Sequence, residues 1–121
     1  MSDTSGDEYA RHTDPDTSKT AGHLRRNERV AIEKNLLLAY ARAAVRGAGL
    51  SSEEAMYECN YDIANDGHRR RCSDLVRKKN IAPQFADGQK VKRYVERTGA
   101  YRTVYVITDV GIDRLIADGL I

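Results

Sequence analysis

Hydrophobic residues recur with a helical period over residues 27–46, a stretch that contains no Pro or Gly and is rich in Ala, Leu, Arg and Glu. The main stripe of this predicted helix consists of Leu37, Ala41, Ala44 and Ala48, with Val30, Leu38 and Val45 beside it. Leu36 and Tyr40 widen the apolar surface, so we expect packing on two sides, against the domain and against the first helix or a partner. Gly47 and Gly49 should end the helix.

A shorter helix is expected before this one, from residue 14 to about residue 23. Asp14 can serve as N-cap, Pro15 suits the first helical position, and Asp16 complements the helix dipole. Residues 1–13 show no apolar period and should be disordered or loosely attached. The chain has 121 residues, too few for two comfortable cores, so residues 14–121 should form a single domain.

Two short helices should follow the long one. Ser51-Ser-Glu-Glu54 has the pattern of a capping box, and the helix after it should run to about residue 59. Its inward side chains would be Ala55, Met56 and Cys59, and its acids Glu53, Glu54 and Glu58, with Asp62 beyond, should form a solvated face. The turn-rich residues 60–67 contain one apolar anchor, Ile63.

The second short helix should run from a cap at Asn65 or Asp66 to about residue 79. Its core side would carry Cys72, Leu75, Val76 and the stem of Lys79, with Ile81 beyond. By the 100° step, Arg69, Arg70, Ser73 and Arg77 fall on the opposite, outward side. Asn80 is the expected left-handed residue at the end of the helix.

The pattern then changes towards period 2. Residues 103–108 read as a β-branched and aromatic strand, and Thr98-Gly99-Ala100 reads as the tip of a hairpin. Residues 81–85 and 91–95 both remain candidates for the incoming arm, separated by an Asp87-Gly88 turn. Thr108 and Asp109 should cap a last helix, whose inward residues would be Ile112, Leu115, Ile116 and Leu120.

This order of elements predicts an α+β fold that is mainly helical: a winged helix-turn-helix with a C-terminal β-hairpin wing and a closing helix. No run of about 18 apolar residues is present, and the polar N-terminus lacks a signal pattern, which favours a cytoplasmic protein. Cys59 and Cys72 have no partner set for zinc and should be two reduced, partly buried thiols.

Charge is segregated along the chain although the net charge is only +2. Residues 68–102 contain eleven Lys or Arg and three acids, so this segment carries +8 and the remainder −6. Such segregation is typical of proteins that bind polyanions, although basic runs also serve only as solubilising surface.

The candidate DNA contacts follow from this segment. On the second short helix they are His68, Arg69, Arg70, Ser73, Arg77 and Lys78, and on the wing they are Lys92, Arg93, Arg97 and Arg102, with Lys90 nearby. Arg69 and Arg70 could read guanine O6 and N7 or contact phosphates. His68 could instead be an ordinary exposed residue, Arg71 should pair with an acid or a phosphate, and Asp74 should orient Arg70 or Arg77.

Four tyrosines are expected in the core or at its edge: Tyr57, Tyr61, Tyr94 and Tyr105. Tyr101, at the wing tip, could either stack on the nucleic acid or pack on the hairpin.

Several motifs resemble a known family. His68-Arg-Arg-Arg-Cys-Ser-Asp-Leu-Val-Arg-Lys-Lys-Asn-Ile81 resembles the recognition helix and exit of small winged-helix proteins. Thr98-Gly99 with Val104-Tyr-Val-Ile-Thr-Asp-Val-Gly111 resembles the wing return and the opening of the last helix. Thr13-Asp-Pro-Asp-Thr-Ser-Lys-Thr-Ala21 resembles the start of short helix-turn-helix proteins encoded by phages of actinobacteria. The resemblance spans residues 13–111 and implies DNA binding in gene regulation or phage replication control, in the host cytoplasm if phage-encoded.

The sequence therefore predicts a sequence-specific binder of double-stranded DNA, with no cofactor, metal or catalytic residues. Two alternatives stay open: a winged-helix module for protein–protein interaction, and an accessory DNA-binding protein in replication or recombination. A homodimer is a further hypothesis, motivated by the apolar surface around Leu36 and Tyr40 and by Leu120 and Ile121.

Overall fold

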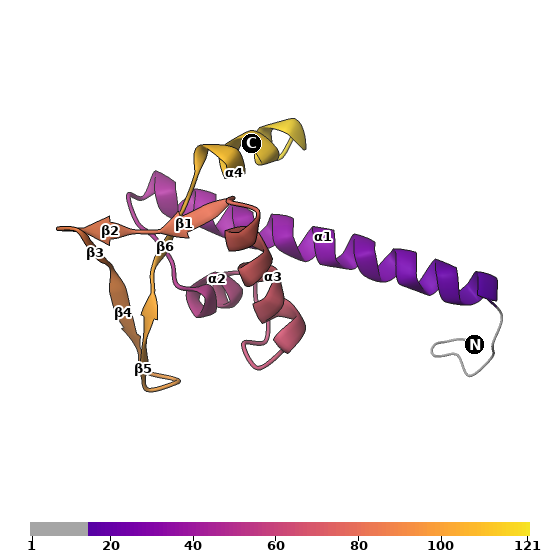
Figure 1. Ribbon diagram of the computed structural model, residues 1–121, viewed down its shortest axis with the longest axis horizontal. Helices are drawn as coiled ribbons and strands as arrows, with labels where there is room; N and C mark the ends of the chain where they lie inside the picture. Colours follow the sequence, from indigo (N-terminus) through magenta and orange to yellow (C-terminus); the bar gives the residue numbers. More distant parts are fainter. Residues whose placement is uncertain (1–14) are drawn as a thin grey trace. The chain divides into compact units, whose positions relative to one another are not determined.

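The computed structural model describes the backbone of residues 15–121 and the side chains of residues 26–121. In this part of the chain about half of the residues are helical, and short antiparallel strands make up the β portion, so the fold is α+β (Figure 1). The elements are α1 (Pro15–Val45), α2 (Ser52–Glu58), α3 (Asp66–Arg77), β1 (Ile81–Pro83), β2 (Phe85–Ala86), β3 (Gln89–Lys90), β4 (Lys92–Val95), β5 (Ala100–Thr103), β6 (Tyr105–Ile107) and α4 (Asp109–Ala117). One compact unit comprises Ala31–Ile121, and the interactions described below lie within it.

Helix α1 is continuous, so the predicted break between a short helix to about residue 23 and a second helix from residue 27 is wrong. No proline follows Pro15 in this stretch, and the residues between the two predicted helices are good enough helix formers to bridge them. The proposed cap Asp14 and the N-terminal tail lie outside the described residues. At the other end the prediction is confirmed: Gly47 takes a φ of 73°, and the Ala48 N–H donates to the Ala43 carbonyl.

The core face of α1 differs from the predicted stripe. Within residues 26–45 of α1, the buried side chains are those of Glu33, Leu36, Leu37, Ala39, Tyr40 and Ala43. Ala44 and Val45, predicted to face inward, are exposed, whereas Leu36 and Tyr40 are buried inside the domain itself. The interpretation of Leu36 and Tyr40 as a partner surface is therefore wrong, because side chains of this same unit cover them. The rest of the core comes from Leu50, Ala55, Met56, Cys72, Leu75, Ile81, Val104 and Leu115.

The caps of α2 and α3 agree with the sequence. Ser51 and Glu54 form the reciprocal capping box, and the Asn65 side chain accepts from the amides of Gly67 and His68. The exit of α3 differs: Lys79, with a φ of 63°, is the left-handed residue, and Asn80 is buried. Lys79 and Val76 are exposed and do not belong to the core side. Lys79 follows the end of α3 at Arg77, where the helical period stops, and Val76, inside the helix, lies one position past the buried Leu75 and is 36% exposed.

Residues 81–85 and 91–95, the two candidates for the incoming arm of the hairpin, both contain strands, and these strands belong to different pairs. β1 pairs antiparallel with β6, β2 with β3, and β4 with β5. The three pairs meet where the Gln84 N–H donates to Val104 O, the Val104 N–H to Val91 O, and the Val91 N–H to Gln84 O, at 2.8–2.9 Å. From this cyclic junction β2–β3 and β4–β5 leave in different directions (Figure 1). The predicted turns are confirmed, with positive φ at Asp87, Gly88 and Gly99.

Helix α4 begins as predicted at Thr108, whose hydroxyl oxygen accepts from the Gly111 N–H and whose O–H donates to Lys79 O at 2.6 Å. Gly111 is required here for space, since a Cβ would collide with the Asn80 carbonyl. Leu115 is buried and Ile112 half-buried, but Ile116 and Leu120 are 55% and 41% exposed, contrary to the prediction. Ile116 follows the buried Leu115 by one position, a rotation of about 100° that turns its side chain away from the core, and Leu120 lies beyond the end of the helix at Ala117. Of the helices in the described part of the chain, none has the length and apolar character to cross a membrane.

Candidate nucleic-acid interface

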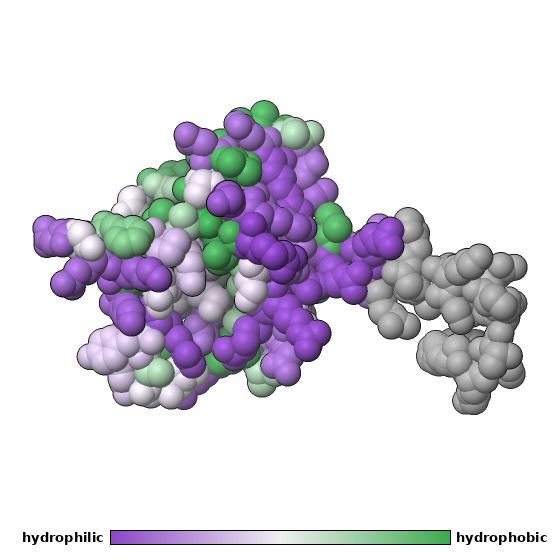
Figure 2. Space-filling model, in the orientation of Figure 1, coloured by the Kyte–Doolittle hydropathy of each residue, from purple (hydrophilic) through white to green (hydrophobic). Residues whose placement is uncertain are grey.

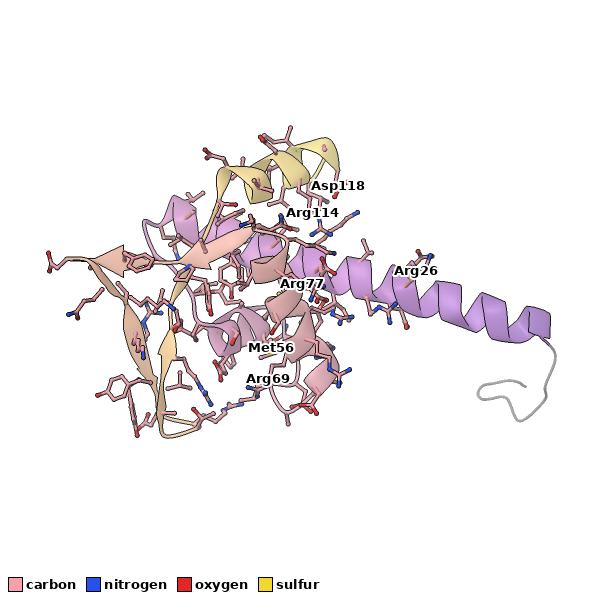
Figure 3. The ribbon with its side chains drawn as sticks, viewed as in Figure 1. Arg26, Met56, Arg69, Arg77, Arg114 and Asp118 are labelled. Carbon is pink, nitrogen blue, oxygen red and sulfur yellow. The ribbon has the colours of Figure 1, made fainter. Side chains whose placement is uncertain are left out.

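Helix α3 is fixed by its buried side and presents a polar side to solvent. Cys72 and Leu75 are buried, and Arg70, Ser73 and Arg77 are exposed, in agreement with the predicted two faces. Arg69 and Arg77 lie near opposite ends of the helix (Figure 3). Arg69 is only half-exposed, so it lies at the margin of the outward face.

Arg69 is engaged by the domain itself. Its Nη2 donates to the Ile63 carbonyl at 2.8 Å, and its Nη1 lies 3.7 Å from the Glu53 carboxylate. The same carboxylate lies 3.0 Å from the Nε of Arg102 in β5. Neither Arg102 Nε nor Glu53 Oε2 has a well-directed hydrogen bond, so the contact is an ion pair in character. Glu53 thus links α2 to α3 and to the β4–β5 arm.

Asp74 organises two other arginines of α3. It lies 2.7 Å from Arg77 Nη2 and 3.0 Å from Arg71 Nε. The predicted orientation of Arg77 by Asp74 is present, and so is the expected acid partner of Arg71. Arg77 remains 69% exposed at the side chain, so its pairing leaves it accessible.

Lys78 is exposed but pairs with a buried carboxylate. Its Nζ lies 2.9 and 3.1 Å from the two carboxylate oxygens of Glu33, which is 3% exposed. Arg114 Nη1 donates to Glu33 at 3.0 Å and to the Asn80 side-chain oxygen at 2.7 Å. A buried carboxylate requires such partners, because an unpaired charge out of water is costly. Lys78 therefore joins the end of α3 to Glu33 of α1, and Arg114 joins the same carboxylate to α4.

His68 lies against Tyr61. The two rings are stacked, with centroids 4.4 Å apart and planes at 27°. His68 was expected either to contact DNA or to be an ordinary exposed residue. It is half-buried, so the second of these expectations is wrong.

The β4–β5 arm carries four of the predicted contacts. Arg93 Nη1 hydrogen-bonds Glu54, and Lys92 and Arg97 are exposed. Burial alone would raise the pKa of Glu54, but hydrogen bonds from Arg93 and from the Ser51 amide lower it below its ordinary value.

The tyrosines of the strand arm are more exposed than expected. Tyr94 and Tyr101 form an edge-to-face pair with centroids 5.3 Å apart and are 52% and 68% exposed. Tyr101 therefore packs on the hairpin, one of its two predicted roles.

Tyr57 and Tyr94 were expected in the core or at its edge, but Tyr57 is 70% exposed because it lies on the outer side of α2. Tyr61 and Tyr105 are half-buried, as expected.

The structure separates the eleven cations of residues 68–102 into two groups. Six pair with carboxylates: Arg69, Arg71, Arg77, Lys78, Arg93 and Arg102. For the other five, no carboxylate of the described residues lies within ion-pair distance: Arg70, Lys79, Lys90, Lys92 and Arg97. In this second group, Arg70 belongs to α3, Lys79 follows its end, and the other three belong to the two strand arms, β2–β3 and β4–β5 with their turns. All five side chains are exposed.

Sequence reasoning missed Glu33 and Glu53, the two buried carboxylates that hold these cations. Glu53 was assigned to a solvated acidic face, but it is 4% exposed because α3 and β5 close over it. Nothing in the local pattern distinguishes Glu53 from Glu54. A useful signal would have been the surplus of arginines in residues 68–102, which requires acidic partners from elsewhere in the chain.

Three further observations bear on chemistry. Cys59 and Cys72 are free thiols, as expected, and burial raises the pKa of Cys72 to about 12. No group of three His, Cys, Asp or Glu within residues 26–121 is arranged to hold a metal ion. A cavity of about 80 Å³ beneath α3 is lined by Arg69 and Ser73 among others.

No protein-family model, curated protein or solved structure matches this chain.

Proposed function

We propose that this protein binds double-stranded DNA through α3 and the strand arms and acts as a regulator of transcription. In this proposal α2, residues 59–65 and α3 work as a helix-turn-helix, and β4–β5 works as the wing. The observation that carries it is the group of five exposed cations without acidic partners among the described residues: Arg70, Lys79, Lys90, Lys92 and Arg97.

The outward face of α3 would enter the major groove. Arg70 and Arg77 are exposed on it, with Ser73 between them, and an exposed arginine can donate two hydrogen bonds to guanine. The helix is capped by Asn65 and held by the buried side chains of Cys72 and Leu75, so its outward residues are presented on a rigid support. Arg70 is our main candidate for base readout, since Arg69 is occupied by Ile63 and Glu53.

The strand arms would contact the DNA backbone. Lys90, Lys92 and Arg97 are exposed there without acidic partners among the described residues, and cations of this kind neutralise phosphates. Arg93 and Arg102 would contribute mainly by fixing the arm on Glu54 and Glu53. The predicted contacts therefore divide into residues that meet DNA and residues that position them.

The test is fluorescence anisotropy of mixed duplexes of about 25 base pairs over a series of salt concentrations. We expect the logarithm of the affinity to fall linearly with the logarithm of salt, and Arg70→Ala to reduce that slope by about 1 if it contacts phosphate, or to relax base preference if it reads guanine. Arg26→Ala is the matched control, an exposed cation of α1. Equal, weak binding by wild type, Arg70→Ala and Lys90→Ala/Lys92→Ala near physiological salt would overturn the proposal.

Arg69→Ala is a poor probe of DNA contact because it also removes a partner of buried Glu53.

A selection from random duplexes separates the regulator from an accessory DNA-binding protein in replication or recombination. Enrichment of one motif supports the regulator, and tight binding without enrichment supports the accessory role.

The second candidate function is protein–protein interaction, favoured by three large side chains on the surface. Tyr57, Phe85 and Tyr101 are 70%, 60% and 68% exposed, and aromatic residues are enriched at protein interfaces. If Arg70→Ala/Arg77→Ala leaves the biological activity intact while Tyr57→Ser/Phe85→Ser abolishes it, the interaction module is the better assignment.

A further inference from the structure

A second surface of the unit, between the C-terminal part of α1 and α4, is apolar. A groove of about 470 Å³ lies there, lined by Leu38, Ala41, Val45 and Ile112 and by Leu120 and Ile121 beyond α4. Val45 is 89% exposed, and Ile121 and Leu120 are 58% and 41% exposed. In Figure 2, hydrophobic surface gathers over α4 at the top of the view. Contiguous apolar surface of this kind marks an interaction site in a folded protein.

The groove combines a projection and a hollow. Val45 stands out from the last turn of α1 at its rim, whereas Ile112 lines the groove from α4 and is half-buried. A two-fold interface brings the same patch of both copies together, so it needs a projecting group and a recess that accepts it on one surface. This groove has both.

The charges around the groove are also complementary to one another. Arg42 lines it from α1 and is exposed. On α4, Asp109 and Asp113 are exposed and lie three positions before and one position after Ile112, which lines the groove. None of the three has an ion-pair partner among the described residues. A patch with a basic α1 edge and an acidic α4 edge is complementary to a second copy turned by 180°.

We propose that a second copy of this chain occupies the groove, forming a two-fold homodimer. Val45 of each copy enters the recess between α1 and α4 of the other, and Arg42 of each copy lies opposite Asp109 and Asp113 of the other. This inference rests on the apolar groove and its charged edges, and it stands or falls independently of DNA binding. If the protein does bind DNA, the dimer presents two copies of α3, as required for a site with two half-sites.

The test is sedimentation equilibrium of the full chain over micromolar to hundreds of micromolar concentrations. We expect wild type to pass from 13.6 kDa to twice that mass, and Val45→Glu to remain at 13.6 kDa with unchanged circular dichroism. Tyr57→Glu is the control, because Tyr57 is a 70% exposed side chain outside the groove, and this variant should dimerise like wild type. A wild type that stays monomeric throughout overturns the proposal and leaves the groove to another partner.

Charge reversal provides a second, more specific readout. Arg42→Glu should weaken dimerisation by about tenfold or more, and Asp109→Arg/Asp113→Arg added to it should restore most of the affinity. Dimerisation that survives both Val45→Glu and Arg42→Glu would place the interface elsewhere and overturn the proposal as well.

Discussion

The carboxylate of Glu53 in α2 lies 3.0 Å from Nε of Arg102 in β5. The Glu53 side chain is 4% exposed and the Arg102 side chain 40% exposed. Arg69 of α3 reaches the same carboxylate at 3.7 Å. One buried acid thus sets the position of the strand arm relative to the helix that we propose as the DNA-reading element. A buried charge tolerates this position only while both arginines remain.

Arg102→Ala should therefore destabilise the protein. It leaves the Glu53 carboxylate with the longer Arg69 contact alone, and we expect a loss of about 1–3 kcal/mol, below the value for a fully buried pair because Arg102 is partly exposed. Urea unfolding measures the loss. Arg97→Ala is the control, because Arg97 lies on the same arm without an acidic partner in the described part of the chain, and it should lower the free energy of unfolding little. In a Glu53→Gln background, Arg102→Ala should lower the free energy of unfolding less than it does in wild type.

Gly111→Ala should destabilise the closing helix. A Cβ there would collide with the Asn80 carbonyl and lie 2.8 Å from Ile107 Cγ1, so either backbone or core must shift. We expect a loss of about 1–3 kcal/mol, the usual cost of overpacking, in thermal or urea unfolding. Val110→Ala is the control, because Val110 is the preceding residue and 52% exposed; comparable losses for the two variants would contradict the steric explanation.

Stability should fall in acid through Glu54. Its pKa is lower in the folded protein than its ordinary value of 4.5, so protonation is opposed by folding. The stabilisation is present above the ordinary pKa and disappears as the pH falls through the lower folded-state pKa. We expect Glu54→Gln to reduce the free energy of unfolding near pH 7 and to match wild type near about pH 2.

The control for this pH dependence is Glu96→Gln, because Glu96 is exposed and has no cation within ion-pair distance among the described residues. Its difference from wild type should stay small and nearly constant over the same range. If the loss of unfolding free energy caused by Glu54→Gln grew as the pH falls, it would contradict a lowered pKa of Glu54 in the folded protein.

The two thiols should react slowly in the folded protein. Burial raises the pKa of Cys72 to about 12 and also raises that of Cys59, so little thiolate exists at pH 8. Cys72 is 4% exposed, and Cys59 is half-buried and donates to the Asn35 carbonyl. A disulfide reagent should therefore label Cys59 before Cys72, and both should react rapidly in denaturant.

Cys72→Ser identifies which thiol gives each phase of that reaction. The fast phase of the wild type should remain in this variant. Labelling of Cys72 at the rate of the denatured protein, under conditions where circular dichroism reports a folded chain, would contradict its burial.

Local chemistry was readable from the sequence wherever neighbours in the chain decide the structure. The capping box of Ser51 and Glu54, the cap at Asn65, the turn at Gly99 and the start of α4 at Thr108 each depend on residues within a few positions of one another. The outward placement of Arg70, Ser73 and Arg77 followed from helical period and two buried neighbours. The exit of α3 was misassigned by one residue, since both Lys79 and Asn80 can follow a helix end.

The sequence by itself determined the α+β character, the order of the short helices and the hairpin tip at Gly99, and the concentration of positive charge in residues 68–102. Only the tertiary structure decided which cations lack a carboxylate partner among the described residues, because Glu33 and Glu53 reach Lys78, Arg69 and Arg102 across 16 to 49 positions of the chain. It also decided that Leu36 is core and Val45 is surface, since a helix with apolar residues around much of its circumference buries whichever side its neighbours cover. Local periodicity carries no information about such long-range partners, and burial is set by them.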